Sequence, residues 1–249
     1  MIFNYDDEQN ILNQVLTASV NTLLLHGNSF ERKLLRFFQN AEDFTANNGH
    51  EALPPDYYSE TYNIMFDVTR INDTEIKKGY NPHFIREREM QKKAISSRII
   101  KGNETAVIYD AENEEKNEHC YKNYKKMARR VFEDHINKIP KWIKQFPKIK
   151  YKGLLIFDET ECFFEGEPKL LCNNKIAYKP LKLHKPWNDK NLMEKLYDSE
   201  LDFVVWLCPY KQFNEVVQKF SVSYPSMVIV DLRFRSTNYE KYQEEKLVS

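Results

Sequence analysis

Runs of consecutive apolar residues constrain the fold of this chain more than any other feature of its sequence. Three such runs lie at 153–157, 203–207 and 227–230. A strand with one face in water alternates apolar and polar residues, whereas a continuously apolar strand is buried on both faces. Buried strands of this kind are typical of a parallel sheet covered by helices. The sequence therefore predicts an α/β fold with a mostly parallel central sheet flanked by helices.

Apolar spacing and turn residues place the remaining elements. Asn28 precedes Glu31 by three residues, a spacing typical of a helix start. Strands are expected at 62–71 and 106–109, and helices at 7–25, 28–38, 84–100, 117–138, 140–146, 188–198 and 211–220. Residues 40–58 are expected to form a surface loop, and 162–181 a hairpin or an irregular insertion. We expect a single domain over 1–249, with a helical N-terminal region (1–58), an α/β core (59–236) and a polar, frayed tail (237–249).

Composition limits the class of protein and its location. Apolar residues make up 41% of the chain and charged residues 30%, so the chain can form a core and is not disordered. With 6 glycines, glycine-rich phosphate loops are nearly excluded. No signal peptide is recognisable, and no apolar run approaches the ~20 residues of a transmembrane helix. The four cysteines form no C-x-x-C pair and are predicted to be buried free thiols, which favours the cytoplasm.

Aspartates end four of the predicted strands, at Asp67, Asp110, Asp158 and Asp231. In open α/β sheets, ligands bind beyond the carboxyl ends of the strands. Carboxylates gathered there suit Mg²⁺ or Mn²⁺, so Asp67, Asp110 and Asp158 are candidate metal ligands. A simpler interpretation stays open, because aspartate also ends strands by accepting hydrogen bonds from the following turn.

Asp158 and Glu159 form the best single candidate for a catalytic carboxylate site. The strand before them matches the hhhhDE form of a Walker B strand, but the chain lacks the G-x-x-x-x-G-K-[ST] loop that an ATPase requires. With Asp67, these two residues are the candidate catalytic set of a metal-dependent phosphodiesterase. Glu-x-Lys patterns give only a weak likeness to PD-(D/E)XK nucleases. They begin at Glu75, Glu114 and Glu167.

A basic segment from Lys122 to Lys152 is interleaved with aromatic residues. Lysine and arginine neutralise phosphates and aromatic rings stack on bases, so this segment is a candidate nucleic-acid-binding surface. The candidate binding residues on its helix are Lys122, Lys125, Lys126, Arg129 and Arg130. The alternative is an amphipathic helix with a solvated basic face and tyrosines turned to the core.

Residues 62–71, 119–139 and 151–161 resemble parts of uncharacterised proteins from low-GC Gram-positive bacteria and their mobile elements. In these proteins the strand that corresponds to 154–159 also ends in Asp-Glu. The resemblance covers about two-thirds of the chain and implies a bacterial setting, with no activity attached.

Three functions remain open at the level of sequence. The first is a non-catalytic binding protein for nucleic acid or a protein partner. The second is a metal-dependent phosphodiesterase or nuclease that uses Mg²⁺ or Mn²⁺, and it requires Asp67 and Asp158 to meet at a common point. The third is an enzyme acting on a nucleotide-like ligand at the carboxyl edge of the sheet.

Overall fold

The structure is a computed structural model, and it describes only part of the chain. The described residues are Leu12, Val15 and Ala18 together with 21–40, 45–46, 55–71, 121–160, 162–170, 176–208, 211, 224–236 and 238–248. Three predicted elements therefore lie outside the described residues: the helix at 84–100, the strand at 106–109 and, apart from Lys211, the helix at 211–220. Of the predicted helix at 7–25, the described Leu12, Val15 and Ala18 are helical.

The main sheet has seven strands in the order β1-β9-β8-β5-β4-β3-β2. Their bounds are Thr22–Leu24 (β1), Met227–Asp231 (β9), Phe203–Leu207 (β8), Tyr151–Asp158 (β5), Ile64–Ile71 (β4), Tyr57–Ser59 (β3) and Thr45–Ala46 (β2). The pairs β1/β9, β8/β5 and β5/β4 are parallel, whereas β9/β8, β4/β3 and β3/β2 are antiparallel. The α/β class is thus confirmed, but the predicted mostly parallel sheet is confirmed only in part, because three of the six strand pairs are antiparallel. A continuous apolar run indicates that a strand is buried on both faces but does not indicate its direction. β9 is fully buried although it is antiparallel to β8.

The predicted helical N-terminal region is not confirmed, although one of its predicted helices forms. Helix α2 (Ser29–Gln39) begins as predicted, with the Asn28 side chain accepting a hydrogen bond from the Glu31 amide at 2.9 Å. However, β1 occupies positions that were assigned to the first helix, and β2 and β3 occupy positions assigned to a loop. β1 pairs with β9, about 200 positions later in the chain, and local periodicity does not report such a partner. β2 and β3 are short strands that pair with each other and with the adjoining β4.

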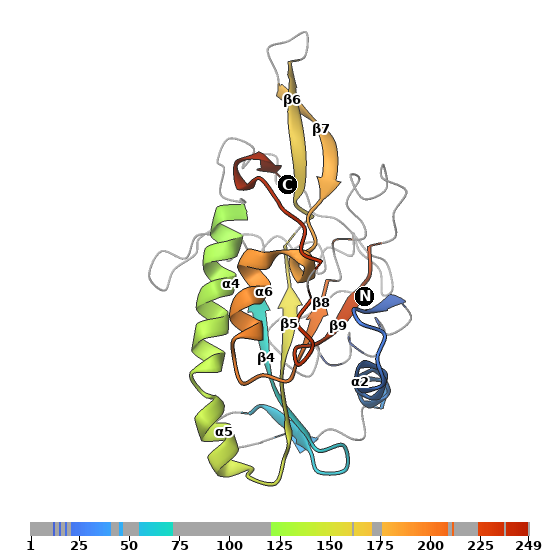
Figure 1. The fold of residues 1–249 in the computed structure, drawn as a ribbon, viewed down its shortest axis with the longest axis vertical. Coiled ribbons are helices and arrows are strands. Elements are labelled where there is room, and N and C mark those ends of the chain that lie inside the picture. Colours follow the sequence, from blue (N-terminus) through green and yellow to red (C-terminus); the bar gives the residue numbers. More distant parts are fainter. Residues whose placement is uncertain are drawn as a thin grey trace, which may run out of the picture.

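Helices α4 (Tyr121–Ile136), α5 (Ile139–Gln145) and α6 (Lys190–Tyr197) lie on one face of the main sheet, and α2 lies on the other (Figure 1). The apolar stripe of α4 repeats every three or four residues and is buried; it consists of Tyr121, Tyr124, Ala128 and Phe132. Phe132 meets the Trp206 ring edge-on, with centroids 5.9 Å apart. The predicted helices at 117–138, 140–146 and 188–198 are confirmed within a few residues.

A second sheet of three strands, in the order β10-β6-β7, extends away from the main sheet (Figure 1). β6 (Phe164–Leu170) and β7 (Ile176–Leu183) form the expected hairpin. β10 (Leu247–Val248) pairs with β6, and the short helices η4 (Pro186–Asn188) and η6 (Glu244–Lys246) flank the junction. The C-terminal tail is therefore not frayed as expected, because Leu247 is buried against the core. Within the described parts of the chain, no helix has both the length and the apolar character needed to cross a membrane.

Candidate nucleic-acid interface

The basic segment of the sequence forms α4, α5 and the loop that leads into β5. Residues 121–150 contain ten lysines and arginines but only two acidic residues, Glu133 and Asp134. The apolar stripe of α4 packs on the sheet, and the exposed residues of the helix lie away from that stripe. The exposed basic side chains, called here the α4–α5 basic face, are Lys122, Lys126, Arg129, Arg130, Lys141, Lys144, Lys148 and Lys150. Four of the five predicted binding residues belong to it.

Acidic partners neutralise little of this face. Lys125, the fifth predicted residue, is partly buried and paired with Glu244 of the C-terminal segment. Arg130 and Asp134 lie 3.9 Å apart on the exposed side of α4, a contact worth at most about 1 kcal/mol. The lysines of this face that form no ion pair with any residue in the described ranges are Lys122, Lys126, Lys141, Lys144, Lys148 and Lys150. The surface therefore carries a net excess of positive charge.

The aromatic residues of the segment do not share this surface. Tyr121, Tyr124 and Trp142 are at most 2% exposed and pack in the core. Burial is the main reason why the pKa values of the Tyr121 and Tyr124 hydroxyls are raised. The predicted stacking of bases on these rings is therefore wrong, and the alternative of tyrosines turned to the core is right. Tyr151, at the start of β5, stays partly exposed.

Asp67 serves as a link between the sheet and α4. Its carboxylate is 1% exposed and its Oδ2 lies 2.7 Å from Nδ1 of His135, with Nζ of Lys138 at 4.0 Å. The Asp56 amide donates to its other oxygen at 3.0 Å. Asp67 lies in the middle of β4 and not at its end. Through these contacts Asp67 holds the C-terminal end of α4 against the sheet.

Asp158 lies at the end of β5, where donors surround both of its oxygens. Oδ1 accepts hydrogen bonds from the amide and hydroxyl of Thr160 at 3.1 and 2.6 Å, and it lies 3.3 Å from Nζ of Lys211. Oδ2 accepts from the Tyr124 hydroxyl at 2.9 Å and from the Trp206 indole at 3.0 Å. Asp158 and Lys211 are 0% and 1% exposed. Burial alone would lower the pKa of Lys211, but the adjacent Asp158 carboxylate raises it above its ordinary value.

A second buried carboxylate lies beside this pair. Asp189 caps the N-terminus of α6 by accepting from the Asn191 amide at 2.8 Å. Its other oxygen lies 2.8 Å from Nε2 of His184 and also accepts from the Tyr121 hydroxyl. Burial lowers the pKa of His184, and despite its own burial the pKa of Asp189 is lowered by the hydrogen bond from His184. We call the two carboxylates and their partners the buried polar network; it consists of Asp158, Lys211, Thr160, Tyr124, Trp206, Asp189, His184 and Tyr121.

The described aspartates do not converge as expected for a metal site. Asp67 is paired with Leu154 and Asp158 with Ile71, so their backbone positions are offset by four residues, about 13 Å, along parallel strands. Asp231 lies at the opposite edge, because β9 runs antiparallel to β8. Among the described residues, no group of three or more His, Cys, Asp or Glu side chains is placed to hold a metal ion. The predicted ligand Asp110 lies outside the described residues, so its part in an Mg²⁺ or Mn²⁺ site stays a prediction.

The candidate Glu159 and the buried Glu31 also lie apart from these aspartates. Glu159 is oriented toward Arg70, with 3.6 Å between Oε1 and Nη1. Glu31, on α2, is fully buried on the other face of the sheet and accepts hydrogen bonds from the amides of His26 and Asp231. Neither side chain joins Asp67 or Asp158 in a shared site.

Sequence reasoning missed Lys211, His184 and Asp189. One local signal was available for Asp189, which stands immediately before an amphipathic helix, a position typical of an N-cap. Lys211 carried a weaker signal, a single charge after the apolar strand β8. No local signal pairs it with Asp158, which is 53 positions earlier in the chain.

Comparison with known proteins yields no match, whether with family models, with curated proteins or with solved structures.

Proposed function

We propose that the protein is a non-catalytic nucleic-acid-binding protein that holds the phosphate backbone on its α4–α5 basic face. The observation that carries this proposal is the set of exposed lysines on α4, α5 and the following loop that form no ion pair with the described residues. Lysines placed in this way release counterions when they meet phosphates, which is the main source of sequence-independent affinity for nucleic acids. The formal net charge of the chain is zero, so this basic surface is a local feature and not a result of overall composition.

The chemistry of the face favours a nucleic acid over a protein partner. Protein interfaces are centred on tryptophan, tyrosine and arginine anchors in apolar pockets, and lysine is depleted in them. The large apolar side chain of α5 that is exposed beside the lysines is Ile143, at 40%. Helix α4 has 16 residues and is about 24 Å long, which corresponds to about seven base pairs of a duplex. Backbone contacts of this kind predict weak preference for base sequence.

Charge reversal combined with a salt titration tests the proposal. The test variants are Lys122→Glu/Lys126→Glu on α4 and Lys141→Glu/Lys144→Glu on α5. Binding of a fluorescently labelled 20-base-pair duplex is measured by anisotropy between 50 and 200 mM NaCl. We expect each double variant to weaken binding at least tenfold, and the slope of log affinity against log salt to fall by about one for each lysine that contacts a phosphate.

A matched control distinguishes the effect of the α4–α5 basic face on binding from the effect of overall net charge. Lys190→Glu/Lys241→Glu makes the same charge change at two exposed lysines outside the face, and it should alter affinity less than threefold. Absence of binding at 50 mM NaCl, or equal losses in test and control variants, would contradict the proposal. The same duplex with Mn²⁺ and with EDTA tests for cleavage. Metal-dependent cleavage would favour the phosphodiesterase hypothesis and its untested ligand Asp110.

A further inference from the structure

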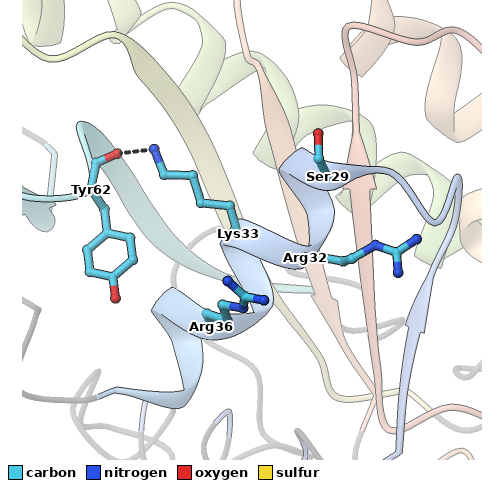
Figure 2. Close-up of a pocket in the computed structure, with 5 residues that line it drawn as sticks. All are labelled: Ser29, Arg32, Lys33, Arg36 and Tyr62. Carbon is cyan, nitrogen blue, oxygen red and sulfur yellow. Dashed lines mark hydrogen bonds between the residues drawn. The ribbon is translucent and has the colours of Figure 1, made fainter.

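A second basic surface lies on the opposite face of the main sheet, on α2. A pocket of about 480 Å³ opens between this helix and the turn that joins β3 to β4. It is lined by Ser29, Arg32, Lys33, Arg36 and Tyr62 (Figure 2). Successive turns of α2 present the three cations on its outer side, while Phe30, Leu34, Phe37 and Phe38 pack inward on the sheet. The pocket has the size of a small-ligand site.

The positive charge of this pocket is not balanced by carboxylates of the described residues. Arg32 donates to the carbonyl oxygen of Gly27, and Lys33 donates to that of Tyr62 at 2.7 Å. A carbonyl oxygen orients a cation without neutralising it. The single acid of α2 is Glu31, whose carboxylate is buried and accepts backbone amides on the other side of the helix. The lining therefore has three positive charges and no negative one.

Phosphate is the ligand class that fits this lining. A guanidinium offers paired N–H donors that match the oxygens of a phosphate, and two arginines with one lysine suit a dianion. A terminal phosphate monoester carries nearly two negative charges at neutral pH, whereas each diester within a strand carries one. The Tyr62 ring, packed 5.1 Å from that of Phe37, adds an aromatic wall beside the cations (Figure 2).

The pocket adjoins the end of the α4–α5 basic face. Nζ of Lys33 and Nζ of Lys150 each lie 5.1 Å from the centroid of the Tyr151 ring. The backbone makes the same connection, since the Tyr151 amide donates to the carbonyl of Asn63, next to Tyr62, at 3.0 Å. A nucleic-acid strand that runs along the lysines of α5 and of the loop after it would therefore reach the α2 pocket.

We propose that the α2 pocket is a binding site for a phosphate monoester, and that it takes the terminal phosphate of a strand bound to the α4–α5 basic face. This assignment to a strand end rests on the proposed function. The phosphate chemistry does not, because a free nucleotide presents the same group. Binding of phosphorylated strand ends and binding of the free nucleotide are therefore measured separately.

The first measurement compares single-stranded 12-mers that carry a 5′ phosphate, a 3′ phosphate or no terminal phosphate. We expect the wild-type protein to bind one phosphorylated form at least fivefold more tightly than the unphosphorylated one. Arg32→Gln/Arg36→Gln should abolish that preference while binding of the unphosphorylated strand changes less than twofold. The matched control Lys122→Gln/Lys126→Gln should weaken all three strands equally and keep the preference.

In the second measurement, AMP and inorganic phosphate are titrated into the same proteins, and binding is measured by calorimetry. Binding of AMP that is lost in Arg32→Gln/Arg36→Gln and kept in Lys122→Gln/Lys126→Gln supports the pocket even if no strand binds, and would assign it to a free nucleotide. Thermal melts establish that the variants are folded. A wild-type protein with neither a phosphate preference nor AMP binding overturns the proposal, as does a preference that survives in Arg32→Gln/Arg36→Gln.

Discussion

The two faces of the main sheet are built from different chemistry. Under α4 and α6, the core contains the buried polar network, in which two carboxylates, a lysine and a histidine are excluded from water. Under α2, the core is aromatic and aliphatic, with rings of Phe37, Phe38 and Phe66 in edge-on contact. Glu31 is the one buried charged side chain of α2, and backbone amides satisfy it. Both faces of the sheet thus bury an apolar cluster, and the face under α4 and α6 contains the buried polar network in addition.

This difference predicts how each face responds to substitution. A buried ion pair contributes little net stability relative to an apolar pair, but removal of one partner leaves an uncompensated charge in the interior. An apolar face loses stability in proportion to the methyl groups removed and the cavity that remains. We therefore expect abrupt, coupled losses under α4 and α6, and graded, additive losses under α2.

The largest loss is expected for Asp158→Asn. The substitution keeps the shape of the side chain but removes the negative charge that lies 3.3 Å from the buried Nζ of Lys211. We expect the free energy of unfolding to fall by about 3–5 kcal/mol in urea denaturation. In the double variant Asp158→Asn/Lys211→Met the charge is gone, so the loss should be smaller than the sum of the single losses by more than about 1 kcal/mol. Additive losses would show that the two side chains are not coupled.

Gly153→Ala tests the packing under α2. A Cβ at Gly153 of β5 would lie 2.1 Å from the ring of Phe203 on the neighbouring strand β8, so the ring must move. We expect a loss of about 1–3 kcal/mol, typical of an overpacked core. The companion variant Gly153→Ala/Phe203→Leu makes room for the new methyl group and should be more stable than the sum of the two single changes predicts. A Gly153→Ala protein as stable as wild type would mean that this face is loosely packed.

Ile229→Val is expected to cost about 0.5–1.5 kcal/mol, because it removes one methylene from the apolar face and leaves all hydrogen bonds in place. Chemical denaturation of this variant alone and combined with Asp158→Asn compares the two faces directly. Since the residues share no partner across the sheet, the losses should add within about 0.5 kcal/mol. Strong coupling between them would contradict the separation of the two faces.

The smallest effect concerns pH and His184. Burial lowers the pKa of His184 below its ordinary value of 6.5, so the folded protein binds fewer protons here than the unfolded chain does. Stability should therefore fall as pH drops below about 7, by at most ~0.7 kcal/mol between pH 7 and pH 6. Asp189, with a lowered pKa, contributes stability that is lost only at more acidic pH, below about 4.

His184→Gln isolates this contribution. The free energy of unfolding is measured at pH 7 and at pH 6 for the variant and for the wild-type protein. The decrease between the two pH values should be smaller in the variant, and the difference is the contribution of His184. The same slope in both proteins would show that His184 does not govern stability in this range.

Local patterning predicted much of the framework around these faces. The strand at 203–207 matches β8, and the predicted helix at 117–138 contains α4 within it. The exposure of the α4–α5 basic face also followed from sequence, since apolar residues at helical spacing leave the other positions to solvent. The contacts of Asp67 did not, because its partners His135 and Lys138 lie about 70 positions later in the chain.

The sequence alone determined the longer helices and the buried strands β4, β5, β8 and β9, the apolar stripe that α4 buries, and the gathering of positive charge on one helical surface. These properties depend on neighbours within a few positions, so the periods of helix and strand reveal them. Only the tertiary structure decided that β9 runs against β8, that β1 pairs with it across some 200 positions, and that Lys211 neutralises Asp158. Strand direction, register and buried charge pairs arise from contacts between segments far apart in the chain, and no local pattern specifies which distant segment will be the partner.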